Sequence, residues 1–122
     1  MKRAIPILLI LTLNSCYLLG ENGIKVAIKN KSNEPITNLE FSTTENLEVI
    51  RIDRIEPKEQ INDFLSMEKN KLDGGYTLTY TRANGETELL QAGYYTVGGS
   101  LDQSIKFTIE ADTTMIVFSD YY

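Results

Sequence analysis

The chain has 122 residues, of which 42% are hydrophobic and 24% charged, so its length suits one domain and is too short for two of ordinary size. It contains no His and a single Cys, which excludes a Ser-His or Cys-His nucleophile pair, an imidazole metal ligand, a multi-thiolate zinc site and an internal disulfide. Acidic side chains outnumber basic ones by 17 to 12, for a formal charge of −5. Nucleic-acid binding is therefore not expected, because it requires clustered Lys and Arg.

The N-terminal segment has the pattern of a secretory signal. Lys2 and Arg3 precede an apolar run, residues 4–13, which ends at Asn14, Ser15 and Cys16. A helix needs roughly 20 apolar residues to cross a bilayer, and this run is much shorter. The pattern therefore favours a signal peptide over residues 1–15 and disfavours a permanent transmembrane helix.

The segment Leu13-Asn14-Ser15-Cys16 resembles the lipobox of bacterial lipoproteins. Leu lies three positions before the Cys and a small residue directly before it, although Asn14 departs from the usual residue at its position. The resemblance implies that Cys16 becomes an acylated N-terminus, with residues 16–23 as a tether. Because multiple acyl chains give stable anchoring, it also implies a lipid-anchored protein of the cell envelope, held at the outer membrane if the host has two membranes. A cleaved soluble signal with an incidental Cys is the alternative.

From Ile24 onward the hydrophobic period is two, which predicts β-strands. Apolar and polar residues alternate over 24–29, 36–44, 76–81 and 105–109, and an Asn-Gly pair at 84–85 predicts a hairpin turn before a return strand over about 86–92. Lys25 and Lys29 fall on the polar side of the first strand, where we expect them to be solvated.

Three further segments are less regular. Residues 47–55 change phase midway, which predicts a bulge or bend. Residues 60–67 suit a strand after the turn at Pro57, and a helix over residues 58–70 is the alternative. Residues 115–118 are four consecutive apolar residues, a pattern typical of a strand that is covered on both sides.

Together these segments predict seven to nine short strands at the spacing of an antiparallel, two-sheet β-sandwich over residues 24–122. The strand and turn pattern resembles immunoglobulin-like or transthyretin-like domains. That resemblance implies an all-β fold, but without the Cys pair and Trp of antibody-type domains.

Catalytic patterns are weak, so we expect no catalytic residue, no metal and no cofactor. Ser66 and Lys69 have the spacing of a serine penicillin-recognising motif, in a chain much smaller than those enzymes. Glu86 and Glu88 lie two residues apart, whereas a glycosidase places its two carboxyl groups across a sugar-sized cleft. A small hydrolase is therefore disfavoured.

The strongest recognition signal is the segment 93–100. Tyr94 and Tyr95 are followed by Gly98 and Gly99. Tyr offers a large contact area at low entropic cost, and Gly allows close backbone approach, so these four residues are the candidate partner-binding site. In the alternative interpretation, a tyrosine ring packs inward and the glycines only turn the chain.

These observations predict a membrane-anchored, exported, non-catalytic protein that binds a protein partner, for example in an envelope or secretion assembly. Removal of residues 1–15 changes the formal charge from −5 to −7, because Lys2 and Arg3 are lost. Such a charge accelerates association with a basic partner. An immunity-type lipoprotein that neutralises a basic secreted toxin is therefore the alternative function.

Overall fold

The computed structural model describes residues 21–119. The expected signal peptide over residues 1–15, the lipidation site Cys16 and the tether up to residue 20 lie outside the described residues. Within 21–119 there is no helix with the length and apolar character needed to cross a bilayer.

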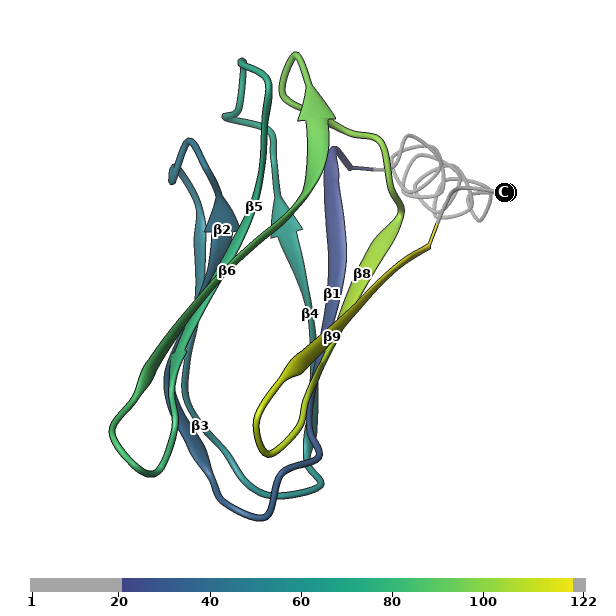
Figure 1. Cartoon of the computed structure of the whole chain (residues 1–122). Helices are drawn as coiled ribbons and strands as arrows, with labels where there is room; N and C mark the ends of the chain where they lie inside the picture. The colour runs from purple at the N-terminus through teal and green to yellow at the C-terminus, as the bar shows by residue number, and fades with distance from the viewer. Residues whose placement is uncertain (1–20, 120–122) are drawn as a thin grey trace, which may run out of the picture.

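The described chain folds into two facing β-sheets, which confirms the all-β sandwich (Figure 1). One sheet has the order β4-β1-β8-β9, and the other has the order β3-β2-β5-β6-β7. The strands are β1 (Gly23–Asn30), β2 (Ile36–Thr43), β3 (Val49–Ile55), β4 (Gln60–Ser66), β5 (Gly74–Thr81), β6 (Thr87–Thr96), β7 (Gly99–Ser100), β8 (Ser104–Ile109) and β9 (Thr114–Ser119).

Strand pairing is antiparallel at every described pair except β1 with β8, which run parallel. The first sheet is therefore mixed, where the sequence pattern predicted a purely antiparallel one. A parallel pair needs a long crossover, and here the crossover includes the whole second sheet. This connection places β1, the first strand, in the interior of its sheet, with Lys25 exposed on the outer face as expected.

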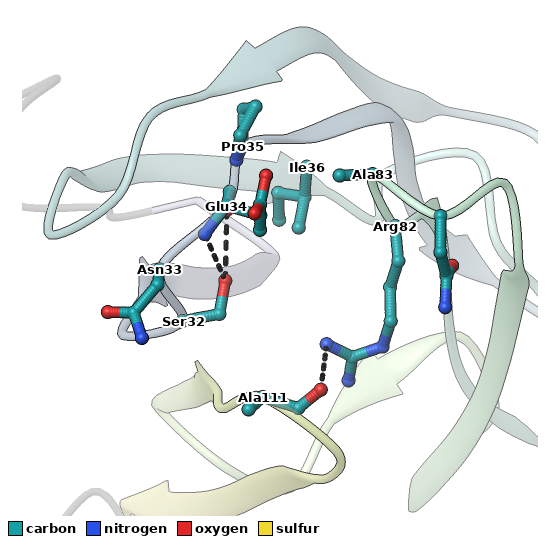
Figure 2. Close-up of a pocket in the computed structure, with 9 residues that line it drawn as sticks. Ser32, Asn33, Glu34, Pro35, Ile36, Arg82, Ala83 and Ala111 are labelled. Carbon is teal, nitrogen blue, oxygen red and sulfur yellow. Dashed lines mark hydrogen bonds between the residues drawn. The ribbon is translucent and has the colours of Figure 1, made fainter.

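The sandwich has two distinct ends. Its N-terminal end is defined by Asn22, which hydrogen-bonds to the carbonyls of Met67 and Gly98, and carries the loops 44–48, 67–73 and 97–98. Its opposite end carries the loops 31–35, 82–86 and 110–113. The Arg82 side chain joins the last two loops by hydrogen bonds to the carbonyls of Glu110 and Ala111, and Figure 2 shows the second of these bonds. The expected Asn84-Gly85 hairpin turn lies at this opposite end, with Gly85 at a φ of 93°.

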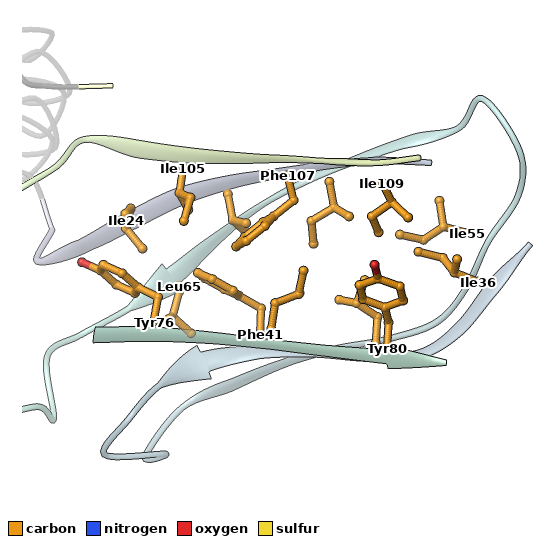
Figure 3. Close-up of a cluster of buried hydrophobic side chains, with 14 of the residues drawn as sticks. Ile24, Ile36, Phe41, Ile55, Leu65, Tyr76, Tyr80, Ile105, Phe107 and Ile109 are labelled. Atoms are coloured by element: carbon orange, nitrogen blue, oxygen red, sulfur yellow. The ribbon is translucent and has the colours of Figure 1, made fainter. Parts of the chain in front are cut away.

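The core lies between the sheets and is built from the alternate, inward-facing residues of both (Figure 3). Phe41 stacks on Tyr76 of its own sheet with ring centroids 6.0 Å apart, and meets Phe107 of the facing sheet edge-on at 5.6 Å. Such aromatic pairs contribute about 0.5–1.5 kcal/mol each beyond the area that they bury. The fully buried side chains around them include Ile24, Ile28, Ile36, Leu39, Ile55, Leu65, Met67, Tyr95, Ile105 and Ile109.

The sheet pairing decides two local expectations and shows an irregularity that the sequence did not predict. Residues 60–66 form β4, not a helix, because Ile61 and Leu65 pair with β1 and face the core. Residues 47–55 contain no bulge, since β3 pairs with β2 without a register shift, and the chain bends at residues 47–48, before β3 begins. The irregularity lies in β2 instead, between Thr37 and Glu40, where Asn38 has a φ of 51°.

The expectation that residues 115–118 are covered on both sides is also wrong. They belong to β9, which lies at the edge of its sheet and alternates between half-buried and exposed residues. Met115 and Val117 point to the outer face and are 54% and 59% exposed. Among residues 21–119, nothing covers the outer face of this apolar run.

Candidate functional site

Segment 93–100 forms the end of β6, a two-residue turn and the short strand β7. Tyr94 is 52% exposed, and its hydroxyl lies 3.5 Å from an Asp73 carboxylate oxygen. Of the four residues predicted to bind a partner, Tyr94 alone presents a large exposed side chain.

The prediction that Tyr95 contacts a partner is wrong, because its ring is fully buried. The ring packs on Tyr76 with centroids 5.7 Å apart, and the hydroxyl donates a 2.6 Å hydrogen bond to Glu45. The cause is a bulge in β6 at Gly93, which has a φ of 74° and shifts the register against β5. After the bulge, Tyr95 instead of Tyr94 faces inward.

The Glu45 carboxylate ties this segment to the loop 67–73. It accepts the Tyr95 hydrogen bond and also backbone N–H bonds from Lys71 and Leu72. The bond from Tyr95 and these N–H bonds lower the pKa of Glu45, because they stabilise its charged form. Burial raises the pKa of the Tyr95 hydroxyl, and its bond to Glu45 raises that pKa further.

Of the two glycines, Gly98 differs from the prediction. Gly98 is buried, and a Cβ at its position would lie 2.0 Å from the Asn70 carbonyl oxygen. The close backbone approach at Gly98 is therefore made within the chain and not with a partner. Gly99 lies in β7 opposite Thr96 and has ordinary space around it.

Sequence reasoning missed a group of exposed apolar residues at the N-terminal end. Leu72 is 66% exposed and Val97 is 80% exposed. We call the exposed large hydrophobic residues of this end the apolar end: Leu47, Leu72, Tyr94, Val97 and Leu101. Single exposed apolar residues are ordinary, whereas five at one end of the sandwich make that end a candidate contact surface.

Val97 has an unusual backbone conformation. It and Gly98 are the central residues of the β6–β7 turn, and both have positive φ, 48° and 74°, as in a type I′ turn. Asn, Asp and Gly are the residues that favour this conformation, whereas a β-branched residue is disfavoured there. An apolar side chain is thus held at the most exposed point of the turn despite a local energetic cost.

The free edge of β9 differs from the other sheet edges. Edge strands carry unpaired backbone groups, and proteins usually protect them with charges, bulges or short strands. Here β3 carries Arg51, Asp53 and Arg54, and β4 carries Asp63. The strand β6, which the two-residue β7 pairs only at its end, carries Glu88 and the bulge at Gly93. The six residues of β9, Thr114–Ser119, include no charge and no Pro.

The opposite end holds a shallow cavity of about 300 Å³, lined by residues 32–36, 82–84 and 111 (Figure 2). Its charged lining residues are Glu34 and Arg82, and the Arg82 side chain is nine-tenths buried. The guanidinium donates to Glu88 at 2.7 Å, to Tyr80 at 3.1 Å and to the carbonyls of Glu110 and Ala111. These bonds use most of its donors, so Arg82 fastens the β5–β6 and β8–β9 turns together.

The weak catalytic patterns of the sequence are not assembled among the described residues. No group of three or more potential metal-ligating side chains occurs among residues 21–119. Ser66 and Lys69 do not share the helix that their motif requires, because Ser66 ends β4 and Lys69 lies in the following turn. Glu88 is paired with Arg82, and Glu86 lies in the hairpin turn beside Asn84.

Comparisons with known proteins support the fold alone. No protein-family model matches the chain. A stretch of 68 residues is 34% identical to the serine/threonine-protein kinase TEL1 of Saccharomyces cerevisiae, and the match spans 55% of this chain but 2% of the kinase. The NMR structure of a protein from Eubacterium rectale is similar with a TM-score of 0.53 at 11% identity, over 83% of this chain and 92% of that one.

Proposed function

We propose that the protein is an exported lipoprotein, anchored through Cys16, that binds a protein partner in the cell envelope without catalysing a reaction. The observation that carries the binding role is the unprotected edge of β9. The lipobox resemblance at residues 13–16 supports the anchor.

The sequence of β9 supports a partner that covers it. Four consecutive apolar residues are typical of a strand buried on both faces, yet Met115 and Val117 are more than half exposed in the isolated chain. Complete burial of an aliphatic side chain contributes about 1.5–3 kcal/mol, so covering these two half-exposed residues contributes roughly 1 kcal/mol each. A partner would supply the missing cover.

The geometry favours strand addition. A partner segment in extended conformation pairs with the free backbone N–H and carbonyl groups of an edge strand and places alternate side chains on the two sheet faces. Beside Met115 and Val117 such a segment would present apolar residues on the outer face. The net charge of the chain adds a preference for a basic partner through faster association.

The test is a pull-down from the native host with tagged full-length protein, crosslinked at the membrane and analysed by mass spectrometry. Val117→Lys places a charge on the edge strand, and we expect it to reduce partner recovery at least tenfold. Leu89→Lys is the matched control, because Leu89 is equally exposed but lies on the outer face of the other sheet. Equal recovery with both variants rejects the β9 edge as the binding surface.

The identity of the recovered protein separates the two envelope roles. Several envelope or secretion components support an assembly role. A single basic, toxin-like protein supports the immunity function instead. An empty pull-down with folded, lipidated protein argues against a protein partner.

A further inference from the structure

We propose that the apolar end seats in the headgroup region of the bilayer that holds the lipid anchor. This inference rests on the proposed anchoring through Cys16. It adds a second membrane contact, made by Leu72, Tyr94 and Val97 of the folded domain. This contact sets the orientation of the sandwich relative to the membrane.

The position of the apolar end follows from the path of the chain. Asn22 donates hydrogen bonds of 3.0 and 2.9 Å to the carbonyls of Met67 and Gly98, so the first described residues are fastened to these loops. Five residue steps separate Cys16 from Glu21, and an extended chain spans at most about 18 Å over that length. An acyl group on Cys16 therefore keeps the apolar end close to the membrane surface.

The distribution of exposed apolar residues agrees with this placement. Residues 21–119 have eight exposed large hydrophobic residues, of which five lie at the N-terminal end, two lie on β9, and the last, Leu89, lies on β6 away from that end. Val97 is the most exposed of the eight, and it occupies a turn position where Asn or Gly is favoured. Contact with lipid gives a reason for an apolar residue at that point.

The apolar end is rigid before any contact is made. The backbone N–H of Val97 donates to Asp73 at 2.8 Å, and that of Gly98 donates to the Leu72 carbonyl at 2.9 Å. Glu45 holds the same loop through the N–H of Lys71. Because these bonds fix the loops already, little conformational entropy is lost when the side chains enter the headgroup region.

The charged residues around the apolar end indicate which class of lipid headgroup it contacts. Acidic residues in its loops are Glu45, Glu48, Glu68 and Asp73, against Lys69 and Lys71. This balance disfavours an anionic surface, since attraction to anionic lipids requires clustered Lys and Arg. Tyr94 has the amphipathic ring that is enriched at membrane interfaces. The proposed contact is therefore with zwitterionic headgroups.

Fluorescence gives a direct test because the chain has no Trp. Val97→Trp introduces a single reporter at the apolar end, and Leu72→Trp provides a second one outside the strained turn. Ala83→Trp is the matched control, in an exposed turn at the opposite end. Each full-length, lipidated variant is reconstituted in phosphatidylcholine vesicles with or without brominated acyl chains.

We expect brominated lipid to quench the Val97→Trp and Leu72→Trp variants at least twofold more than the Ala83→Trp variant, with blue-shifted emission. Vesicle flotation reports the anchor independently. Flotation with equal quenching in all three variants overturns the apolar-end contact and leaves the anchor in place. Failure to float overturns the anchor and the contact together. Crosslinking of position 97 to a protein in native membranes, without quenching in vesicles, assigns the apolar end to a protein partner and also overturns the proposal.

Discussion

At the residue scale, two adjacent tyrosines have opposite roles because one glycine precedes them. Tyr94 lies on the surface, while Tyr95 is part of the core and bonds to Glu45. Both residues have the same chemistry, so composition alone assigns them the same role. The difference arises from the bulge at Gly93, which reverses the side-chain alternation of β6.

This difference predicts unequal effects of substitution on stability. Tyr95→Ala removes a fully buried ring, and we expect a loss of about 3–5 kcal/mol in the free energy of unfolding, as for other buried aromatic residues. Tyr94→Ala should change the free energy of unfolding by less than about 1 kcal/mol. Chemical denaturation of both variants measures these values, and equal losses would contradict the orientation of the two rings.

The Glu45–Tyr95 pair also predicts how stability depends on pH. The pKa of Glu45 is lower in the folded state than its ordinary value near 4.5, so the folded state favours the ionised carboxylate. Its contribution is complete above the unfolded pKa and is lost as pH falls through the folded pKa. The pKa of Tyr95 is raised above 10, so its contribution is complete below 10 and is lost at higher pH.

We therefore expect the melting temperature of Glu45→Gln to fall less than that of the wild type between pH 5 and pH 3. Tyr95→Phe should reduce the loss of stability above pH 10. Melting curves from pH 2 to 11 measure both effects. An acid dependence that is unchanged in Glu45→Gln would show that other carboxylates govern it.

At the scale of the elements, β6 depends on a backbone conformation that few residues adopt. Gly93 has a φ of 74°, and a Cβ there would lie 2.7 Å from the Phe118 ring, which packs against the core from β9. Gly85 has a φ of 93° in the β5–β6 turn, with no atom within 4 Å of such a Cβ. Both positions thus require a positive φ, but only at Gly93 would an added side chain also collide with a neighbouring ring.

The comparison predicts two different losses of stability. Gly85→Ala should lower the free energy of unfolding by about 1–2 kcal/mol, the cost of a left-handed conformation for an L-residue. Gly93→Ala should lower it by about 1–3 kcal/mol more, because the ring of Phe118 must also move. Denaturant titrations of both variants provide the comparison. Equal losses would show that Phe118 adapts freely and that the bulge depends on φ alone.

The bulge also shows where sequence reasoning succeeded and where it could not. Alternation over 24–29 and 76–81, and the Asn84-Gly85 turn, predicted the strands and one hairpin because these signals are local. Period-two alternation contains no information about register shifts or about a strand's position in its sheet. The sequence therefore assigned Tyr95 to the binding site and predicted cover on both faces of residues 115–118. The second error is informative, because it identifies the apolar outer face of an edge strand, from which the binding role is proposed.

At the scale of the whole molecule, the two candidate surfaces do not compete. The apolar end lies beside the first described residues, while β9 runs along the length of the sandwich (Figure 1). With the apolar end on the membrane, the free edge of β9 stays open to a partner in the surrounding compartment. The cavity at Arg82 lies at the opposite end of the sandwich from the apolar end, so the proposed orientation directs it away from the membrane.

This arrangement depends on one side chain outside the described residues, so its last test is Cys16→Ala. Without the thiol no acyl chain can be attached there, and we expect the protein to stay unprocessed or to leave the membrane fraction. Fractionation with immunoblotting and palmitate labelling measure both outcomes. Cys16→Ser is a closer control in size, and it should behave in the same way. A mature-sized protein that remains in the membrane fraction in both variants would contradict lipid anchoring, and with it the orientation that the apolar end implies.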